Sequence, residues 1–547
     1  MTVPALARSA TEWRAFLTGC LVSIAVTGWW LWPALGRGQL LYRDFVQVPD
    51  PALGPATLGL TGSAPRAVPL DAVTALLAPV VPTGVQQQVL LVASLLAGGC
   101  GVAFLVRRHG AAAAGTAAAV ASWSAYAAER LLVGQPPTLL GVAMVPWLVA
   151  AARTSSSCSR RVLLVVLAAL PAALTPFGGL LAVVVVLLAA RTGRDRAVLA
   201  VVGVCWCLPF VVAAVLGSTG AGDGTGAAAF AVRAAGVGGV LDVLTGAGIW
   251  STAATPASRA DPSALLAGSL LLAGAVICLA ARLPRWQQPG GRQDRGLLAL
   301  AALGPPLVAL LLASAPAAPL WARAQSIPGL AVLRDTHRLL GLSVLAVAVL
   351  LGLGVGAVQR HLATTPRVAG AAGAVAAAGL ATLVAAAAIV SVPDAPARLH
   401  QAYRSGSYPA DWDRAVAAVG ERATLVLPWQ PLRSTAALGT QPFLDPLPLA
   451  LPGRVVSAHA LRVERDGRTL TVGAAEEPPD GGAWAAGELD VAALRESGIE
   501  AVVVWRHTPG LLPTGLREDL AVGDHPLPGL TVTATSSLLA VLTLDAV

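Results

Sequence analysis

Long runs of apolar residues, separated by short polar segments, dominate the first 392 residues of the chain. The first run extends from about residue 15 to residue 35 and ends in Trp29-Trp30-Leu31-Trp32-Pro33. A helix needs about 20 mostly apolar residues to cross a bilayer. The pattern therefore predicts a polytopic α-helical membrane bundle with about eleven spans. The further predicted spans are about 87–106, 111–128, 137–152, 162–177, 179–190, 197–217, 263–281, 296–315, 339–358 and 368–392.

The pattern changes after Val392, where shorter apolar runs alternate with polar segments. Residues 423–429 fit a buried strand that ends at Pro428, and Ala501–Trp505 fits another. Residues 455–463 are also predicted to form a strand, and residues 489–497 fit a short helix that leads into Ala501–Trp505. We therefore expect two domains: a transmembrane domain over residues 1–392 and a soluble α/β domain over residues 393–547.

Basic residues mark every second connection between the predicted spans, beginning with Arg107-Arg108 after the second span. Positive residues collect on the cytoplasmic side of membrane proteins, so these connections and the N-terminus are predicted to be cytoplasmic. Three longer connections, 36–86, 218–262 and 316–338, then lie on the outer side. An odd number of spans also places the C-terminal domain outside the cell, with the bundle in the cytoplasmic membrane.

Composition supports this assignment. Hydrophobic residues make up 56% of the 547 residues and charged residues 12%, about half the charge of a typical soluble domain. The net charge of +8 comes entirely from Arg, since the chain has no Lys. Because most of these residues lie in short loops, they indicate orientation rather than nucleic-acid binding. The six Cys fall almost entirely in predicted spans, where small apolar packing explains them.

The first predicted outer loop carries the first candidate site. Asp44 lies about ten residues beyond the Trp cluster and so near the membrane surface, and Arg43 and Asp50 are close to it in sequence. A carboxylate there could act as a general base on an acceptor hydroxyl, or hold a divalent cation against a phosphate. The alternative for Asp44 is structural: it pairs with Arg43 or caps a helix.

Two other predicted outer segments carry the second candidate site. The candidates are Glu129, Arg130 and Gln135 in one short loop, and Arg334, His337 and Arg338 just before a span. Guanidinium groups match phosphate oxygens, so this set suits a lipid-linked phosphate or diphosphate. The alternative is that the arginines reach to ordinary lipid headgroups.

The C-terminal domain has no recognisable nucleophile motif, metal-ligand spacing or dinucleotide fingerprint. Its Trp residues favour core positions over stacking surfaces for carbohydrate. They are Trp412, Trp429, Trp484 and Trp505.

The Trp-rich first span, the Asp soon after it, the many further spans and the C-terminal domain resemble the GT-C superfamily of membrane glycosyltransferases. The segments Glu129–Gln135 and Leu333–Arg338 are similar to loop motifs of its actinobacterial branch, which builds arabinan and mannan chains of the cell envelope. The resemblance implies a polyprenyl-phosphate sugar as donor and an envelope glycan or glycolipid as acceptor. It also implies that Asp44 is the catalytic base. This chain departs from the family in lacking a close acidic pair, because Asp44 and Asp50 are six residues apart.

Two other functions stay open at this point. A transporter of envelope lipids is less favoured, since the predicted spans hold almost no charge and show no clear repeat. A non-catalytic scaffold would use the outer α/β domain to bind another envelope protein.

Overall fold

The computed structural model describes residues 3–60, 67–154, 157–217, 224–281, 283–287, 290–327, 329–365, 371–465, 467–473, 478–486, 489–506 and 529–545. Its contacts divide the chain into two units. The first comprises residues 1–32, 90–207 and 226–401, and the second comprises residues 33–89, 208–225 and 402–547. The predicted outer loop 36–86 thus belongs to the same unit as the C-terminal residues.

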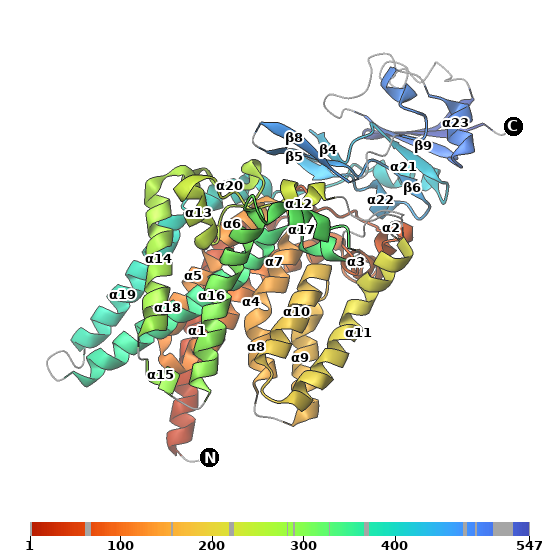
Figure 1. Ribbon diagram of the computed structural model, residues 1–547. Coiled ribbons are helices and arrows are strands. Elements are labelled where there is room, and N and C mark those ends of the chain that lie inside the picture. The colour runs from red at the N-terminus through yellow and green to blue at the C-terminus, as the bar shows by residue number, and fades with distance from the viewer. Residues whose placement is uncertain are drawn as a thin grey trace. The chain divides into compact units, whose positions relative to one another are not determined.

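The first unit is helical (Figure 1). Among the described residues, seven helices are long and apolar enough to cross a membrane. Shorter apolar helices occupy the other predicted spans. The helices at the predicted spans are α1 (Val3–Leu31), α4 (Thr83–Val106), α5 (Ala111–Ser122), α7 (Pro136–Ala143), α8 (Val145–Ala152), α9 (Cys158–Ala172), α10 (Pro176–Ala189), α11 (Gly193–Gly217), α14 (Pro262–Ala280), α16 (Gly291–Ala313), α18 (Leu340–Thr364) and α19 (Ala371–Ser391).

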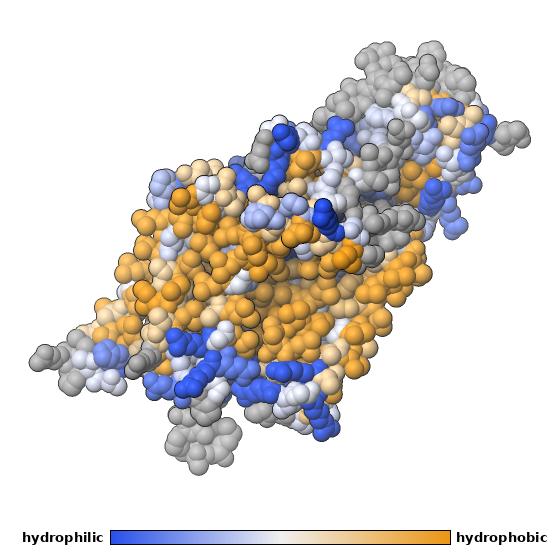
Figure 2. All heavy atoms as spheres, in the orientation of Figure 1, coloured by the Kyte–Doolittle hydropathy of each residue, from blue (hydrophilic) through white to orange (hydrophobic). Residues whose placement is uncertain are grey.

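Helix α18 is the central helix of this unit. It contacts α5, α14, α16 and α19, and it is buried around most of its circumference. A helix that is apolar on all sides is stable only when other helices or lipid surround it. Helices α9, α14 and α16 instead expose large apolar side chains, such as Leu167, Leu270 and Leu311. Figure 2 shows a broad hydrophobic belt over these helices, bounded by hydrophilic residues, so the protein is membrane-embedded.

The helix ends follow from local sequence signals. Thr175 caps α10 by accepting a hydrogen bond from the Gly178 amide, and Pro176 occupies the first helical position. Asp261 caps α14 in the same way. Short elements lie between the long helices: α6 (Ala125–Leu132), α12 (Thr225–Ala229), α13 (Gly236–Leu244), α15 (Pro284–Gln287), α17 (Ala318–Ala324) and α20 (Ala395–Ala402), with 3₁₀ turns at Trp32–Ala34, Arg107–His109, Thr252–Ala254, Ala257–Ala260, Leu330–Leu333 and Thr336–Leu339.

Ion pairs connect the loops that the Arg pattern assigned to one side of the membrane. Glu12 lies 3.6 Å from the Arg107 side chain and 3.5 Å from the Arg108 side chain. Arg153 pairs with Asp294, and Arg161 pairs with Asp195. Connections that the sequence placed together are therefore in contact within the first unit.

The second unit is an α/β domain built on a five-stranded sheet with the order β10-β11-β9-β3-β6. Strands β3 and β9 are parallel, as are β3 and β6, whereas β11 runs antiparallel to both β9 and β10. The strands are β1 (Gln39–Leu40), β2 (Ser405–Gly406), β3 (Thr424–Leu427), β4 (Leu432–Thr435), β5 (Gly439–Leu444), β6 (Val455–Val456), β7 (Leu461–Arg465), β8 (Arg468–Val472), β9 (Ala501–Trp505), β10 (Leu530–Thr535) and β11 (Leu539–Leu544). The helices are α2 (Pro55–Leu58), α3 (Leu70–Leu77), α21 (Trp412–Val419), α22 (Leu447–Ala450) and α23 (Val491–Glu496), with a 3₁₀ turn at Ala483–Ala486.

Strands β3, β9 and most of β11 are buried on both faces, which explains their nearly continuous apolar sequences, whereas the edge strand β10 is largely exposed. Along β9, Val503 and Trp505 face one core, and Val502 and Val504 face the other. The first core also contains Leu41, Val46 and Val48 from the first loop. Residues that precede the C-terminal domain by about 350 positions thus help to form its core.

The predicted fold class, a polytopic helical membrane protein with a C-terminal α/β domain, is confirmed. Strand β9 and helix α23 lie where the sequence placed a strand and a helix. The expected single strand over residues 455–463 was wrong, since β6 and β7 are separate strands there. The β4–β5 hairpin was not predicted.

Candidate functional site

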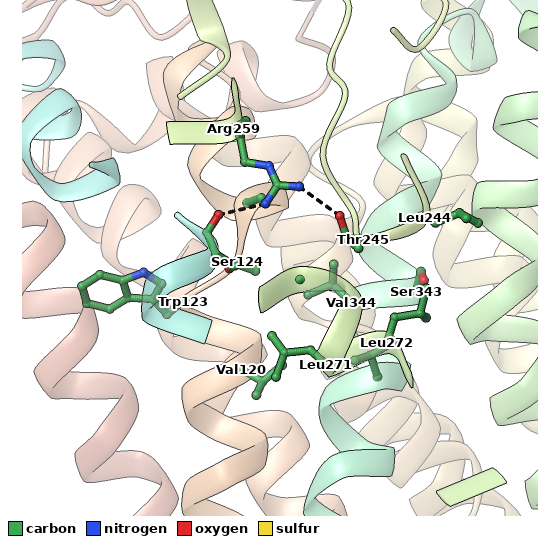
Figure 3. A pocket seen from close by; sticks show the side chains of 14 residues that line it. Val120, Trp123, Ser124, Leu244, Thr245, Arg259, Leu271, Leu272, Ser343 and Val344 are labelled. Atoms are coloured by element: carbon green, nitrogen blue, oxygen red, sulfur yellow. Dashed lines mark hydrogen bonds between the residues drawn. The ribbon is translucent and has the colours of Figure 1, made fainter. Parts of the chain in front are cut away.

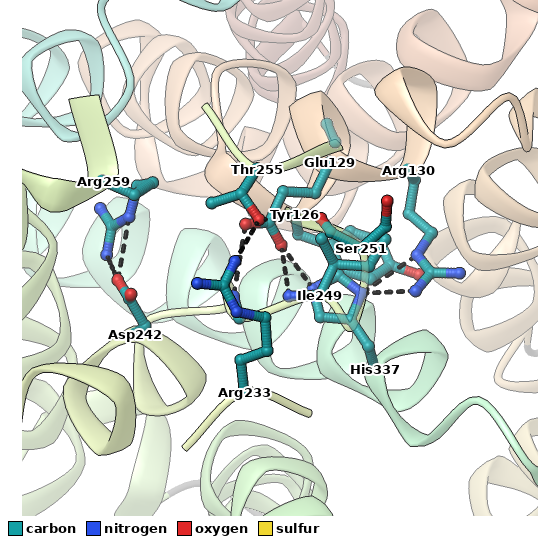
Figure 4. Close-up of polar contacts among 12 residues, drawn as sticks. Tyr126, Glu129, Arg130, Arg233, Asp242, Ile249, Ser251, Thr255, Arg259 and His337 are labelled. Atoms are coloured by element: carbon teal, nitrogen blue, oxygen red, sulfur yellow. Dashed lines mark hydrogen bonds and ion pairs between the residues drawn. The ribbon is translucent and has the colours of Figure 1, made fainter. Parts of the chain in front are cut away.

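The second candidate site of the sequence, the set around Arg130, is a buried polar network in the first unit (Figure 4). It joins helix α6 to two segments far away in sequence, 248–249 and 335–338. These three segments belong to connections that the sequence placed on the same side of the membrane.

Arg130 is at the centre of the network and is completely buried. Its Nη1 lies 2.7 Å from Asp335 Oδ2, and its Nη2 donates to Asp335 Oδ1 at 3.1 Å. Its Nε donates to His337 Nδ1 at 3.0 Å, and Nη1 also donates to Gln135 Oε1 at 2.8 Å. A guanidinium has five N–H donors, so these partners occupy most of its hydrogen-bonding capacity.

His337 connects Arg130 to a second buried carboxylate. Its Nε2 lies 2.9 Å from Glu129 Oε2, and its ring stacks on Tyr126 with the centroids 5.3 Å apart. Because Nδ1 accepts from Arg130 and Nε2 faces a carboxylate, a neutral ring with the proton on Nε2 fits both contacts. Glu129 also accepts from the backbone amides of Gly248 and Ile249, at 3.3 and 3.0 Å.

Arg338 lies at an end of the network that is partly exposed to solvent. Its Nε lies 3.4 Å from Asp335 Oδ2, and its side chain is 20% exposed. The groups of the network follow one another in the order Arg338, Asp335, Arg130, His337 and Glu129. The neutral imidazole lies between a guanidinium and a carboxylate. The formal charges of the two guanidinium groups and the two carboxylates cancel. Burial by itself raises the pKa of Asp335, but Arg130 and Arg338 outweigh burial and lower that pKa to about 2. Asp335 is therefore ionised at neutral pH.

Of the six residues predicted for this site, five meet in the network: Glu129, Arg130, Gln135, His337 and Arg338. Arg334 instead places its guanidinium 4.7 Å from the centre of the Phe230 ring. Glu129, Arg130 and His337 are fully buried and bonded to one another, whereas Arg334 and Arg338 are only partly buried. The sequence reasoning did not select Tyr126, Asp335 or the 248–249 amides. Asp335 stands between Arg334 and Arg338 in sequence, which was the available signal for it.

A second ion pair lies in the same unit, beside a small cavity. Arg259 Nε donates to Asp242 Oδ1 at 3.1 Å, and Arg259 Nη1 donates to the Ser391 carbonyl at 2.9 Å. Burial raises the pKa of Asp242, and Arg259 opposes that rise. Figure 3 shows Arg259 at the polar end of the cavity and Leu271 at its apolar end. With about 40 Å³, this cavity has room for one or two water molecules.

The other predicted site, around Asp44, lies in the second unit. Residues Tyr42 to Phe45 form a tight turn closed by two backbone hydrogen bonds, from Tyr42 N to Phe45 O at 3.1 Å and from Phe45 N to Tyr42 O at 2.8 Å. Tyr42 and Phe45 are buried, and Asp44 is exposed at the tip of the turn. Asp50 is also exposed, in a segment without regular secondary structure.

The backbone of this turn is held firmly in place. Arg43 has a φ of 49°, a left-handed conformation that is unfavourable for a residue with a Cβ. Strand β5 fixes it from both sides, since Arg43 N donates to Pro442 O and Leu444 N donates to Arg43 O, each at 2.8 Å. Such strained residues occur preferentially at functional sites. The turn presents Asp44 to solvent with a defined orientation.

The four Trp residues singled out in the C-terminal domain lie in or beside its two hydrophobic cores. Trp412 and Trp505 are buried in a core of the second unit, whereas Trp429 and Trp484 are half-buried beside the other core. Among the residues that the structure describes, no group of three or more His, Cys, Asp and Glu residues is placed to hold a metal ion.

Comparison with known proteins gives one informative likeness. No family model matches the chain, and no curated protein matches it. The structure is similar to that of a mutant of the arabinofuranosyltransferase AftD from mycobacteria, solved by cryo-electron microscopy, with a TM-score of 0.56 and 17% sequence identity. The alignment covers 98% of this chain but only 42% of the larger protein. At this identity the likeness shows the fold, and the chain has a GT-C-like fold.

Proposed function

We propose that this protein is a GT-C-type glycosyltransferase that transfers a sugar from a polyprenyl-phosphate donor to an envelope glycan or glycolipid. The observation that carries the proposal is the fold likeness, which extends over 98% of the chain to an arabinofuranosyltransferase from mycobacteria. We further propose that transfer takes place at the outer face of the cytoplasmic membrane, with the N-terminus in the cytoplasm and the second unit outside.

Asp44 is the proposed general base. An acceptor hydroxyl must lose a proton as it attacks the anomeric carbon, and a positioned carboxylate can take that proton. The strained, doubly hydrogen-bonded turn supports this role, because it exposes the carboxylate while keeping its backbone rigid. Asp50 is the second carboxylate candidate, and Arg43 is a candidate for contact with the substrate.

Arg334 and Arg338 are the proposed phosphate-binding residues, since both side chains are partly exposed. Charge-assisted bonds from guanidinium groups would stabilise the polyprenyl phosphate as it leaves. Glu129, Arg130, Gln135 and His337 then act as positioning residues, because they hold the segment that carries Arg338. This revises the direct phosphate contact first expected of Arg130 and His337, whose polar atoms already bind each other.

A divalent cation remains part of the proposal. Asp44 offers one exposed carboxylate, and Mg²⁺ or Mn²⁺ commonly takes one or two protein carboxylates, with water and phosphate oxygens as further ligands. Comparing activity in EDTA with activity after restoring Mg²⁺ or Mn²⁺ tests this requirement.

Donor turnover by the purified protein in proteoliposomes tests the function. The substrates are radiolabelled polyprenyl-phosphate pentoses and hexoses with an envelope glycan acceptor, and the product is the newly formed glycosidic bond. We expect Asp44→Asn to lower kcat by a factor of at least about 100, since general-base catalysis contributes about 10²–10⁴. Asp413→Asn, at an exposed carboxylate in the first turn of α21, is the matched control and should retain the wild-type rate.

The other variants separate the proposed roles. Arg338→Gln should raise KM for the donor more than it lowers kcat, and Asp50→Asn tests the second carboxylate directly. An Asp44→Asn protein with the wild-type rate contradicts the proposed base. Movement of the lipid-linked sugar across the vesicle without any glycosidic bond would indicate a transporter. Loss of a stoichiometric protein partner on deletion of residues 393–547, with no turnover by the intact chain, would indicate a scaffold.

A further inference from the structure

A corner of the first unit concentrates exposed positive charge. It is formed by the start of α9, the end of α10 and the start of α11, and its exposed arginines are Arg160, Arg191, Arg194 and Arg196. We call these four residues the arginine corner. They belong to the end of the bundle that carries the N-terminus, where Figure 2 shows hydrophilic side chains below the apolar belt.

Contacts within the protein hold the arginine corner together. The Arg161 side chain pairs with Asp195, which joins the first turn of α9 to the first turn of α11. Thr192 Oγ1 donates to Asp195 Oδ2 at 2.7 Å, and the Asp195 amide donates back to Thr192 Oγ1 at 3.1 Å. Arg161 Nε also donates to the Thr154 carbonyl at 3.2 Å. The arginines from two different connections are therefore kept on one surface.

The electrostatics of this surface are unfavourable without an anion. Both α9 and α11 begin here, and a helix N-terminus carries a partial positive charge that disfavours nearby cations. Within the described residues 157–161 and 190–196, Asp195 is the one acidic residue, and its carboxylate is already bound to Arg161 and Thr192. Elsewhere at this end of the unit, Arg107 and Arg108 pair with Glu12, and Arg153 pairs with Asp294. The arginine corner thus carries a larger uncompensated charge than those pairs do.

Helix length places this charge close to lipid phosphates. Helices α9 and α10 have 15 and 14 residues, which corresponds to about 22 and 21 Å at about 1.5 Å per residue. The hydrocarbon core of a bilayer is about 30 Å thick. A membrane adapts to short helices by thinning locally, and long side chains at helix ends reach for the headgroups. Because α9 and α10 are shorter than the hydrocarbon core, we expect Arg160 and Arg191, at or next to their ends, to reach the lipid headgroups, with Arg194 and Arg196 beside them.

We propose that the arginine corner is a binding site for the phosphate headgroups of anionic phospholipids. Clusters of four or more basic residues beside membrane spans bind anionic lipids, and each residue strengthens binding by about fivefold near the surface. Guanidinium groups add bidentate hydrogen bonds to phosphate oxygens. The site does not depend on the proposed glycosyltransferase activity, and it requires only that the bundle lie in a bilayer.

Native mass spectrometry of the full-length protein, titrated with phosphatidylglycerol or phosphatidylcholine, tests the site. Four Arg→Gln changes in the arginine corner should weaken phosphatidylglycerol binding at least 100-fold and leave phosphatidylcholine binding unchanged. The matched control changes four exposed arginines of the second unit to Gln, with the same loss of net charge, and should alter phosphatidylglycerol binding less than threefold. The control positions are Arg422, Arg454, Arg462 and Arg468.

Two further arms identify the ligand. Arg→Lys at all four corner positions preserves the charge and should keep phosphatidylglycerol affinity within about tenfold, which also excludes misfolding as the cause of the loss. Inorganic phosphate should not displace the lipid at equal ionic strength. An equal fall in the corner and control proteins, or no fall in either, overturns the proposal. Complete displacement by millimolar phosphate would assign the corner to a small soluble anion and also overturn it.

Discussion

The buried network around Arg130 makes a quantitative prediction about stability. Arg130→Met keeps a side chain of similar length but removes the charge and the donors. The Asp335 carboxylate, 4% exposed, then loses both guanidinium contacts and keeps only Arg338 at 3.4 Å. Breaking one partner out of a buried ion pair typically costs about 3–5 kcal/mol. We expect a loss of that size in the free energy of unfolding at pH 7.

The pKa of Asp335 provides a separate estimate. The native environment lowers it from 3.8 to about 2, which corresponds to about 2 kcal/mol of stability at neutral pH. Without Arg130, burial dominates and raises this pKa. In the variant, Asp335 can avoid being a buried unpaired charge by taking up a proton. Protonating a carboxyl of pKa 3.8 at pH 7 costs about 4 kcal/mol, so the penalty for leaving Asp335 unpaired cannot exceed that value. The expected loss of about 3–5 kcal/mol lies between the first value and the sum of the two, which is about 6 kcal/mol.

The sign of the pH dependence follows from these two pKa values. In the wild type, the lowered pKa stabilises the fold above pH 4 and loses this effect as the pH falls toward 2. In Arg130→Met, the raised pKa makes the fold less stable as the pH rises above 4. The difference between the two proteins should therefore shrink as the pH falls from 7 to 4.

Steric trapping in bicelles measures these free energies of unfolding under reversible conditions. Arg338→Met is the control, because a partly exposed pair at 3.4 Å should contribute about 0–1 kcal/mol. The double variant Arg130→Met/Asp335→Leu should recover part of the loss, since it leaves no unpaired carboxylate at position 335. A destabilisation below about 1 kcal/mol by Arg130→Met, or one that does not change with pH, would refute this reasoning.

Substitutions at three other positions test local features of the fold through thermal unfolding of the full-length protein. Asp445→Ala leaves the Arg433 guanidinium, which donates to Asp445 at 2.8 and 3.0 Å, buried without its anion, and should cost about 3–5 kcal/mol; a loss under 1 kcal/mol would contradict the buried pair. Arg43→Ile should destabilise by about 1–2 kcal/mol, because a β-branched residue tolerates positive φ poorly, whereas Arg43→Gly should stay within about 1 kcal/mol of the wild type; equal effects would argue against the left-handed turn. Gly178→Ala adds a Cβ that overlaps the Ala172 carbonyl oxygen, so we expect a loss of about 1–3 kcal/mol, and an unchanged unfolding temperature would show that the helices are less tightly packed than the structure indicates.

The membrane bundle was largely predictable because its signals are local. Each span is recognised from its own apolar run, and Arg107-Arg108 marks a helix end without reference to other parts of the chain. Similarly, the unbroken apolar run Ala501–Trp505, with three consecutive Val residues, predicts a strand buried on both faces. Position along a strand then determines which core each residue enters.

The contacts that create the candidate sites were not predictable, because they join distant residues. The hydrogen bond between Arg130 and His337 spans 207 positions, and neither residue type indicates a buried pair by itself. The Arg43 turn is fixed by residues 442 and 444, about 400 positions away. The sequence therefore indicated most of the charged residues of the candidate sites. It did not indicate whether each side chain contacts solvent or another residue of the protein. Arg338 is partly exposed and Arg130 is fully buried, so Arg338 rather than Arg130 is the candidate for substrate contact.

We propose a membrane-embedded protein with a GT-C-like fold whose second unit, with Asp44, faces outward. Topology tests this claim most directly. In a chain with the six native Cys replaced, one new Cys is placed at Ser407, exposed in the second unit, and in a separate protein at Arg191, exposed at the opposite predicted side. A membrane-impermeant thiol reagent on intact spheroplasts should label the Ser407→Cys protein and leave the Arg191→Cys protein unlabelled until lysis. The reverse pattern would place Asp44 in the cytoplasm and contradict transfer at the outer face.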